Sequence, residues 1–298
     1  MPSWNDILRE LQNKEASVEP PLDIIRRKYL RQLHEKTGRN VIAYYSAFLT
    51  NATNGVEIKD NDMNGFMNAI NRIDCSKGLD LILHTPGGGV SATASIVTYL
   101  RSKFGNDIRC FVPQLAMSAG TMIACACKEI YMGKQSSIGP IDPQFGGIST
   151  HGVLEEFDGA IQGVKDEPDS IPIWQTVVRK YHPGFIGECK KAIEFSNELV
   201  TEWLKTGMFA NEADADEKIK AILAHIGSHS KTKQHDRHIS IEEATQNGLK
   251  IIDLESDQEL QDIILSIHHA FMLTFSKANK AVKIVENHIG QASINFVQ

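Results

Sequence analysis

One serine lies among small residues in the segment AMSAGT, residues 116–121. A helical pattern starts at this serine, Ser118, so the backbone N–H of Ala119 is expected to be a free donor at a helix N-terminus. Such a donor, together with the positive end of the helix dipole, would stabilise an alkoxide and a tetrahedral oxyanion. The segment therefore indicates a nucleophilic serine. The alternative is that Ser118 only caps the helix, which is a common role of serine.

A second turn carries three successive glycines in the segment HTPGGG, residues 84–89. Glycines adopt backbone angles that are closed to other residues, and they let another chain approach closely. Their N–H groups can therefore point into a crevice, which suits an oxyanion hole or a phosphate site. The turn lacks the Lys-Ser/Thr ending of a P-loop and the GxGxxG pattern. A plain tight turn remains the alternative.

A third segment, SSIGPIDPQ at residues 136–144, is rich in turn-forming steps. It is expected to form a wall of the same crevice and to pair with an extended peptide. The alternative is a surface loop with a buried Ile138.

Strands and helices alternate around these turns. Strands are predicted at 40–48, 79–84, 107–113 and 129–133, and helices at 62–73, 91–104 and 118–128. This order predicts right-handed βαβ units and a mainly parallel sheet. Both turns follow strand ends, where the ligand crevice of an open parallel sheet lies.

The two ends of the chain and its second half are predicted to be more helical. Helical patterns cover residues 4–13, 22–37, 150–163, 171–206, 211–226 and 257–285, and Ser240 with Glu243 forms a capping box. We therefore divide the chain into an N-terminal helical segment (1–38), a central α/β domain (39–256) and a C-terminal amphipathic helix and tail (257–298).

Composition limits the functional classes. The net charge of −6 over 298 residues leaves no basic footprint, so nucleic acid is not an expected partner. No apolar stretch is long enough to cross a bilayer, and no signal peptide is visible. The five cysteines have no zinc-ribbon spacing and are expected to be free thiols. A cytoplasmic protein without a metal site is therefore predicted.

These segments together resemble one known family. LDLILHTPGGG, followed by AMSAGTMIACACKEIYMGKQSSIGPIDPQ, is similar to the serine dehydrogenase proteinase family, whose relatives are signal peptide peptidase A and, more distantly, ClpP. The likeness covers residues 79–144 closely, and residues 243–254 also look like the family. The resemblance implies an α/β fold of the ClpP/crotonase type, a spiral of βαβ units with a helical C-terminal half.

The resemblance also implies a serine peptidase with a Ser–Lys dyad and no cofactor. Ser118 matches the nucleophile, and the amides of Gly88 and Ala119 match the oxyanion hole, with Gly87 as an alternative to Gly88. A peptide or protein substrate is expected to contact Gly87, Gly89, Ser137, Ile138 and Gly139. A homo-oligomer is expected from the same relatives.

The general base has several candidates. Lys165 lies where the lysine of the relatives would fall, and Lys180, Lys190 and Lys191 compete with it. Such a lysine must be neutral, which burial favours, whereas the acidic neighbours of Lys165 would raise its pKa. A histidine base is the other option, drawn from His151, His182, His225, His229, His235 and His238. The last four are expected to lie in a solvated, polar region.

Two other classes remain open. A crotonase-like enzyme would hold the enolate of an acyl-CoA thioester with the same two amides and would need no nucleophilic serine. A non-catalytic scaffold would keep the fold and lack the base.

Overall fold

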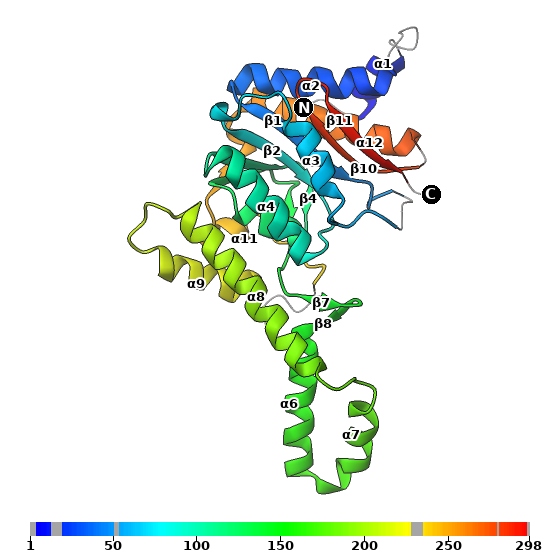
Figure 1. Ribbon diagram of the computed structural model, residues 1–298, viewed down its shortest axis with the longest axis vertical. Helices are drawn as coiled ribbons and strands as arrows, with labels where there is room; N and C mark the ends of the chain where they lie inside the picture. The colour runs from blue at the N-terminus through cyan, green and yellow to red at the C-terminus, as the bar shows by residue number, and fades with distance from the viewer. Residues whose placement is uncertain (1–3, 13–19, 51–53, 228–234, 279, 297–298) are drawn as a thin grey trace.

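The computed structural model describes residues 4–12, 20–50, 54–227, 235–278 and 280–296. Its centre is a sheet with the strand order β11-β10-β1-β2-β3-β5-β9 (Figure 1). The strands are β1 Asn40–Ser46, β2 Leu79–His84, β3 Ile108–Val112, β5 Glu129–Met132, β9 Ile251–Asp253, β10 Ala281–Asn287 and β11 Ala292–Phe296. From β1 to β9 neighbouring strands are parallel, and β10 and β11 are antiparallel. The α/β class and the parallel core are thus confirmed, within a mixed sheet.

Helices cover both faces of this sheet. One side is covered by three helices: α1 Trp4–Gln12, α2 Pro21–Thr37 and α12 Gln258–Lys277. The other side is covered by α3 Asp62–Ile70, α4 Val90–Phe104 and α5 Ala119–Cys125. Successive side chains of β1 alternate between the two cores: Tyr44 packs on the α4 side and Tyr45 on the α12 side. Every residue of β1 and β2 is buried, as expected for strands with helices on both faces.

The C-terminal segment differs from its prediction. A helix over 257–285 was expected, but α12 ends at Lys277 and residues 281–287 form β10, which lies between β1 and β11. The segment AVKIVEN is rich in β-branched residues and is buried along its whole length, so pairing with β1 outweighs its helical spacing. The two ends of the chain also meet in the interior, where Arg26 Nε donates to Glu286 Oε2 over 2.7 Å.

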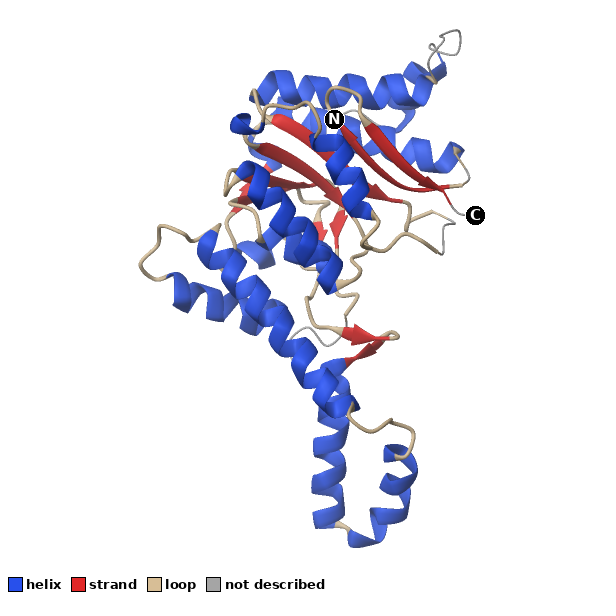
Figure 2. Cartoon of the chain, viewed as in Figure 1, coloured by secondary structure: helices blue, strands red, loops and turns tan. Residues whose placement is uncertain are grey.

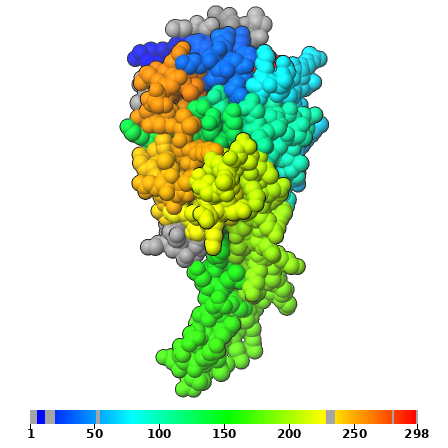
Figure 3. Space-filling view, turned by 90° about the vertical axis from the view of Figure 1, so that its left-hand side faces the viewer, coloured from blue at the N-terminus to red at the C-terminus, as the bar shows by residue number. Residues whose placement is uncertain are grey.

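A helical arm, residues 150–195, projects from the body (Figures 2 and 3). It contains α6 Thr150–Asp166, η2 Pro168–Ser170, α7 Ile171–Val178 and the first half of α8 Phe185–Thr206. One helix was expected over 171–206, but the chain breaks at Pro183-Gly184, where Gly184 has a φ of 88°. The second half of α8 returns to the core through Val200, Trp203 and Leu204.

Shorter elements complete the body. They are β4 Leu115–Ala116 paired in parallel with β6 Ser137–Ile138, the hairpin β7 Gln144–Phe145 and β8 Ile148–Ser149, the helices α9 Ala215–Ile226 and α11 Ile241–Gln246, and the turns η1 Cys75–Lys77 and η3 Leu254–Ser256. Ser240 caps α11 by accepting from Glu243 N, as predicted. Across the described ranges, no helix combines the length and the apolar character that a membrane span needs.

Candidate active site

Ser118 lies between β4 and α5 with a strained backbone. Its φ of 51° and ψ of −117° are rare for a residue that carries a side chain. The strain is imposed by β4, because Thr85 N donates to Leu115 O over 3.1 Å and Thr85 O accepts from Met117 N over 3.0 Å. The Ser118 side chain is half-buried and makes no capping hydrogen bond to α5 within the described structure. Its conformation is therefore not that of an ordinary N-cap.

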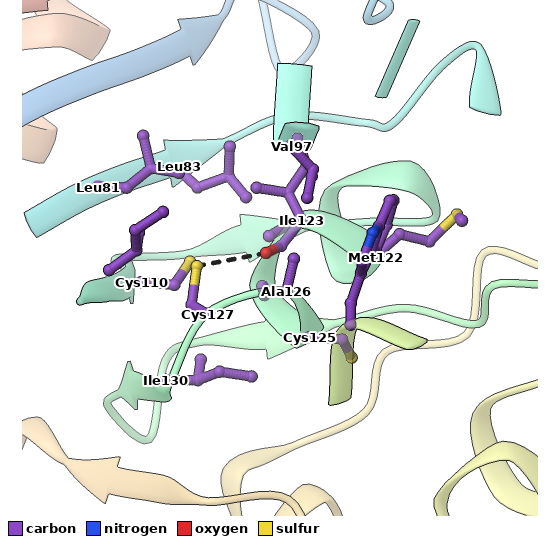
Figure 4. Close-up of a cluster of buried hydrophobic side chains, with 14 of the residues drawn as sticks. Leu81, Leu83, Val97, Cys110, Met122, Ile123, Cys125, Ala126, Cys127 and Ile130 are labelled. Carbon is purple, nitrogen blue, oxygen red and sulfur yellow. Dashed lines mark hydrogen bonds between the residues drawn. The ribbon is translucent and has the colours of Figure 1, made fainter. Parts of the chain in front are cut away.

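The helix that follows Ser118 is anchored in the core. All residues of α5 are buried, and Figure 4 shows Met122 and Ile123 within the apolar cluster that also contains Leu81 and Leu83 of β2. Cys110, Cys125 and Cys127 belong to the same cluster, and all five cysteines are free, as predicted. Rigid packing of this kind holds the start of α5, and with it Ser118, in one position.

Thr121 ties the third segment to this turn. Its Oγ1 lies 2.8 Å from Ala116 O and 2.9 Å from Gly139 O, and it accepts from Gly139 N over 2.9 Å. Thr121 is fully buried, so its hydroxyl joins the Ser118 turn to residues 136–144 rather than acting on the serine hydroxyl.

The glycine turn lies directly against Ser118. A Cβ at Gly87 would stand 2.7 Å from Met117 O and 2.7 Å from the Ser118 Cβ, and the φ of Gly87 is +99°. Both facts require glycine at this position. The two turns that the sequence singles out are therefore in contact.

Gly88 is held from its other side by Ile58. Ile58 N donates to Gly87 O over 2.8 Å, and Gly89 N donates to Ile58 O over 2.9 Å. In such a parallel bridge the N–H and C=O of the middle residue, Gly88, point away from the partner strand. A Cβ at Gly88 would stand 2.3 Å from Ile58 N, so only glycine allows this approach.

Two amides are left available beside Ser118. Within the described residues, no protein group accepts a hydrogen bond from Gly88 N or from Ala119 N. Ala119 N lies against the Gly87 backbone, 3.0 Å from the position of a Cβ on Gly87. Free N–H groups beside a serine are the arrangement that stabilises a tetrahedral oxyanion.

Ser118 opens into a cavity of about 1010 Å³. One wall consists of residues 57–61 and 86–92. A second wall consists of Pro143, Gln144, Phe145 and Gly147 in and next to the β7–β8 hairpin, Ala192 and Phe195 of α8, and His235. Of the predicted substrate-contacting residues, Gly87 and Gly89 line this cavity, together with Gly88 of the predicted oxyanion hole.

Ser137, Ile138 and Gly139 do not line it. Ile138 is fully buried, and its N–H and C=O both pair with Ile239, over 3.1 and 2.8 Å. Ser137 N donates to Gln114 O, and Gly139 N donates to Thr121. The backbone groups that a bound peptide would pair with are therefore already bonded within the chain. The burial of Ile138 agrees with the alternative prediction, a loop with a buried Ile138.

The predicted base, Lys165, is not brought to Ser118 within the chain. It lies in the last turn of α6, and α6 leads away from the body, so Lys165 is exposed near the tip of the arm (Figure 1). Lys180, Lys190 and Lys191 are exposed as well, and none of the four lines the cavity. Of the described lysines only Lys283 is buried, and it is paired with Asp62.

A histidine lines the same cavity as Ser118. His235 lines the cavity together with Ser118, and its Nδ1 lies 2.9 Å from Asp142 Oδ1. The Asp142 side chain is fully buried, whereas 23% of the His235 side chain is exposed. From the sequence, His235 was assigned to a solvated region because its neighbours in the sequence are polar. Its partner Asp142 is distant in the sequence and meets it only in the folded chain.

The other candidate histidines lie elsewhere. His225 Nε2 lies 2.7 Å from Glu243, and His182 is exposed on the arm. His229 lies outside the described residues. No group of described His, Cys, Asp and Glu side chains is arranged to hold a metal ion. His84, which ends β2 before the glycine turn, is buried, and burial lowers its pKa to about 3.

Comparison with known proteins gives a consistent picture. A family model described as ClpP-like SDH-type serine proteinase matches residues 17–274. The uncharacterized protein MJ0137 of Methanocaldococcus jannaschii is 30% identical over 234 residues, which cover 77% of this chain and 74% of the relative. The uncharacterized protein MJ1495 of the same organism is 28% identical over 230 residues, covering 76% and 71%. The range matched by the family model contains both turns, Asp142 and His235.

Proposed function

Because the chain belongs to the family of ClpP-like SDH-type serine proteinases, we propose that it hydrolyses peptide bonds with Ser118 as the nucleophile. The amides of Gly88 and Ala119 form the oxyanion hole of this proposal. The observation that carries it is the contact between Gly87 and the strained Ser118, which leaves both amides free beside one cavity.

We further propose His235 as the general base, oriented by Asp142, in place of the Ser–Lys dyad. A base must reach the serine, and His235 shares its cavity while Lys165 does not. The buried carboxylate of Asp142 holds Nδ1, which leaves Nε2 available to the serine hydroxyl. Serine, histidine and aspartate in these roles form a catalytic triad that recurs on unrelated folds.

The proposed reaction follows from these positions. His235 takes the proton of Ser118 Oγ while Oγ attacks the substrate carbonyl carbon. The carbonyl oxygen becomes an oxyanion that accepts hydrogen bonds from Gly88 N and Ala119 N. The bond to the leaving amine then breaks, and His235 donates the proton to that nitrogen. Water, deprotonated by His235, hydrolyses the acyl-enzyme and releases Ser118.

The finer description of the fold and assembly belongs to the same proposal. The β4–β6 ladder, set apart from the main sheet, supports the ClpP/crotonase-type spiral.

Self-association through the arm is supported by α7, an apolar helix without any buried residue, in which Ile173 is 67% exposed. Ile173→Lys should therefore lower the mass measured by light scattering. A cytoplasmic location is supported by the free thiols.

A fluorophosphonate probe and a peptide library test this function. Wild type should be labelled on Ser118 and should cleave peptides, whereas Ser118→Ala should do neither. Ser95→Ala, on the exposed side of α4, is the matched control. An unlabelled wild type that processes an acyl-CoA would favour the crotonase-like alternative. An unlabelled wild type without any turnover would favour the scaffold.

A further inference from the structure

The glycine turn depends on the loop formed by residues 57–62. Ile58 is the only residue of this loop that bonds the turn within the described structure, through Gly87 O and Gly89 N. Ile58 is 1% exposed and belongs to the main apolar core. The direction of the Gly88 N–H is therefore set by the position of Ile58.

The residues on either side of Ile58 are held by two buried charges. Lys283 Nζ, on β10, donates to Glu57 O over 3.0 Å. Asp62 Oδ2 accepts from Lys59 N over 2.9 Å. Lys283 Nζ also donates to Asp62 Oδ1, which joins the two contacts into one network. Ile58 is thus fixed from the residue before it and from the residue after it.

The network is closed by Tyr44 of β1. Its hydroxyl donates to Asp62 Oδ2 over 2.9 Å, and Tyr44, Asp62 and Lys283 are all buried. Burial and the neighbouring carboxylate raise the pKa of Tyr44, so it remains a neutral donor. Both oxygens of Asp62 are therefore satisfied: Oδ1 accepts from Lys283, and Oδ2 accepts from Tyr44 and Lys59.

A buried ion pair of this kind adds little net stability, because desolvation offsets the attraction between the charges. Its directional bonds, however, restrict where the loop can lie. We propose that Lys283 and Asp62 are positioning residues of the oxyanion hole: through Glu57, Lys59 and Ile58 they aim the Gly88 amide at the substrate carbonyl. This inference rests on the proposed peptidase function.

The decisive variant is Lys283→Met combined with Asp62→Asn. Asparagine keeps an oxygen for Lys59 N and Tyr44, and no charge is left unpaired, so the fold is retained while Lys283 no longer bonds Glu57 O. We expect kcat to fall about tenfold or more with KM unchanged, since loss of a complete oxyanion donor costs about a hundredfold or more. Lys280→Met, at an exposed position before β10, is the control.

A pair of inhibitors gives a readout that a purely structural role would not change. A peptide aldehyde forms a hemiacetal whose oxyanion needs the Gly88 amide, whereas the matching peptide alcohol does not. The variant should lose affinity for the aldehyde by the same factor as kcat and keep its affinity for the alcohol. Unchanged kcat, or equal losses of affinity for both compounds, would overturn the positioning role.

Two further measurements keep the outcomes separate. If the double variant lacks a cooperative thermal transition, Tyr44→Phe is assayed instead, because it removes one hydrogen bond to Asp62. A severalfold lower kcat with unchanged KM supports the proposal, and a wild-type kcat rejects it. Wild type is assayed first. Absence of Ser118-dependent hydrolysis there rejects the proposed function itself, whereas an active wild type with an equally active variant rejects only the positioning role.

Discussion

The two walls of the cavity are built differently. The wall formed by residues 57–61 and 86–92 presents backbone groups, and bonds within the chain fix its shape. The second wall consists of residues of the β7–β8 hairpin and α8, together with His235. Phe195 of this second wall is 43% exposed. In the proposed mechanism, charge stabilisation is therefore assigned to the wall of bonded backbone, and proton transfer and substrate contacts are assigned to the wall at the base of the arm.

The largest expected effect is on the side-chain wall. Asp142→Asn keeps the volume of the residue but favours the wrong tautomer of His235, so kcat should fall by about 10⁴, as in other triads. Steady-state hydrolysis of a peptide by the folded variant provides the measurement. Asp158→Asn, exposed on α6, is the control. Near wild-type kcat in Asp142→Asn would show that this wall does not supply the base.

The backbone wall should be almost as sensitive. Gly87→Ala places a methyl group against Met117 O and the Ser118 Cβ and forces an unfavourable φ, so kcat should drop about a hundredfold or more through the displaced oxyanion hole. Gly38→Ala is the control for backbone strain, because Gly38 also has a positive φ, +68°, but a Cβ there would have no neighbour within 4 Å. It should therefore retain wild-type kcat. Equal activity of the two variants would contradict a preformed wall.

The third prediction concerns stability rather than rate. His84 has a pKa of about 3 in the folded state and about 6.5 when unfolded, so below pH 6.5 protons bind preferentially to the unfolded chain. Its contribution to stability is present above pH 6.5 and is lost as the pH falls toward 3, at about 1.4 kcal/mol per pH unit.

His84→Phe should remove that part of the slope, because phenylalanine can pack against Tyr45 and Phe48. Urea unfolding between pH 4 and pH 7 measures the slope. Burial also lowers the pKa values of His268, His269 and His288, and these histidines contribute to the background slope that His84→Phe retains. A slope identical to that of wild type would show that His84 takes up its proton in the folded state.

The smallest effect is expected at the arm. Lys165→Ala should leave kcat and KM unchanged, because the exposed Lys165 does not line the cavity. Lys190→Ala and Lys191→Ala serve as parallel tests in the same peptide assay. An inactive Lys165→Ala variant would restore the lysine as base, and it would then have to come from a neighbouring copy of the chain.

The same contrast explains what could be predicted from the sequence. Ser118 and the glycines of the first wall are local signals, because a strained turn and a close backbone approach each require particular residue types at adjacent positions. Their contact with each other follows from parallel strands that end at one edge of the sheet. The strand order β1-β2-β3-β5 follows from the alternation of strands and helices in the same way.

The pairing of His235 with Asp142 is not local. The two residues are far apart in sequence, and neither lies in a pattern that indicates burial, so only the fold brings them together. The strand β10 was missed for a related reason. Its apolar residues continue the spacing of α12, and the partner that favours a strand, β1, lies near the other end of the chain. In both cases, contacts between distant parts of the chain decide the structure, and local sequence patterns do not show them.

In the sequence, Lys283 comes after Ser118 by more than half of the chain length. It lies on β10, which pairs with β1. During synthesis, the nucleophile and its glycine turn therefore leave the ribosome well before the residue that anchors the neighbouring loop. A nascent chain would hold a poorly aligned hydrolytic centre until β10 joins the sheet. Under the proposed function and positioning role, cleavage activity therefore begins only after the strand that carries Lys283 has joined the sheet.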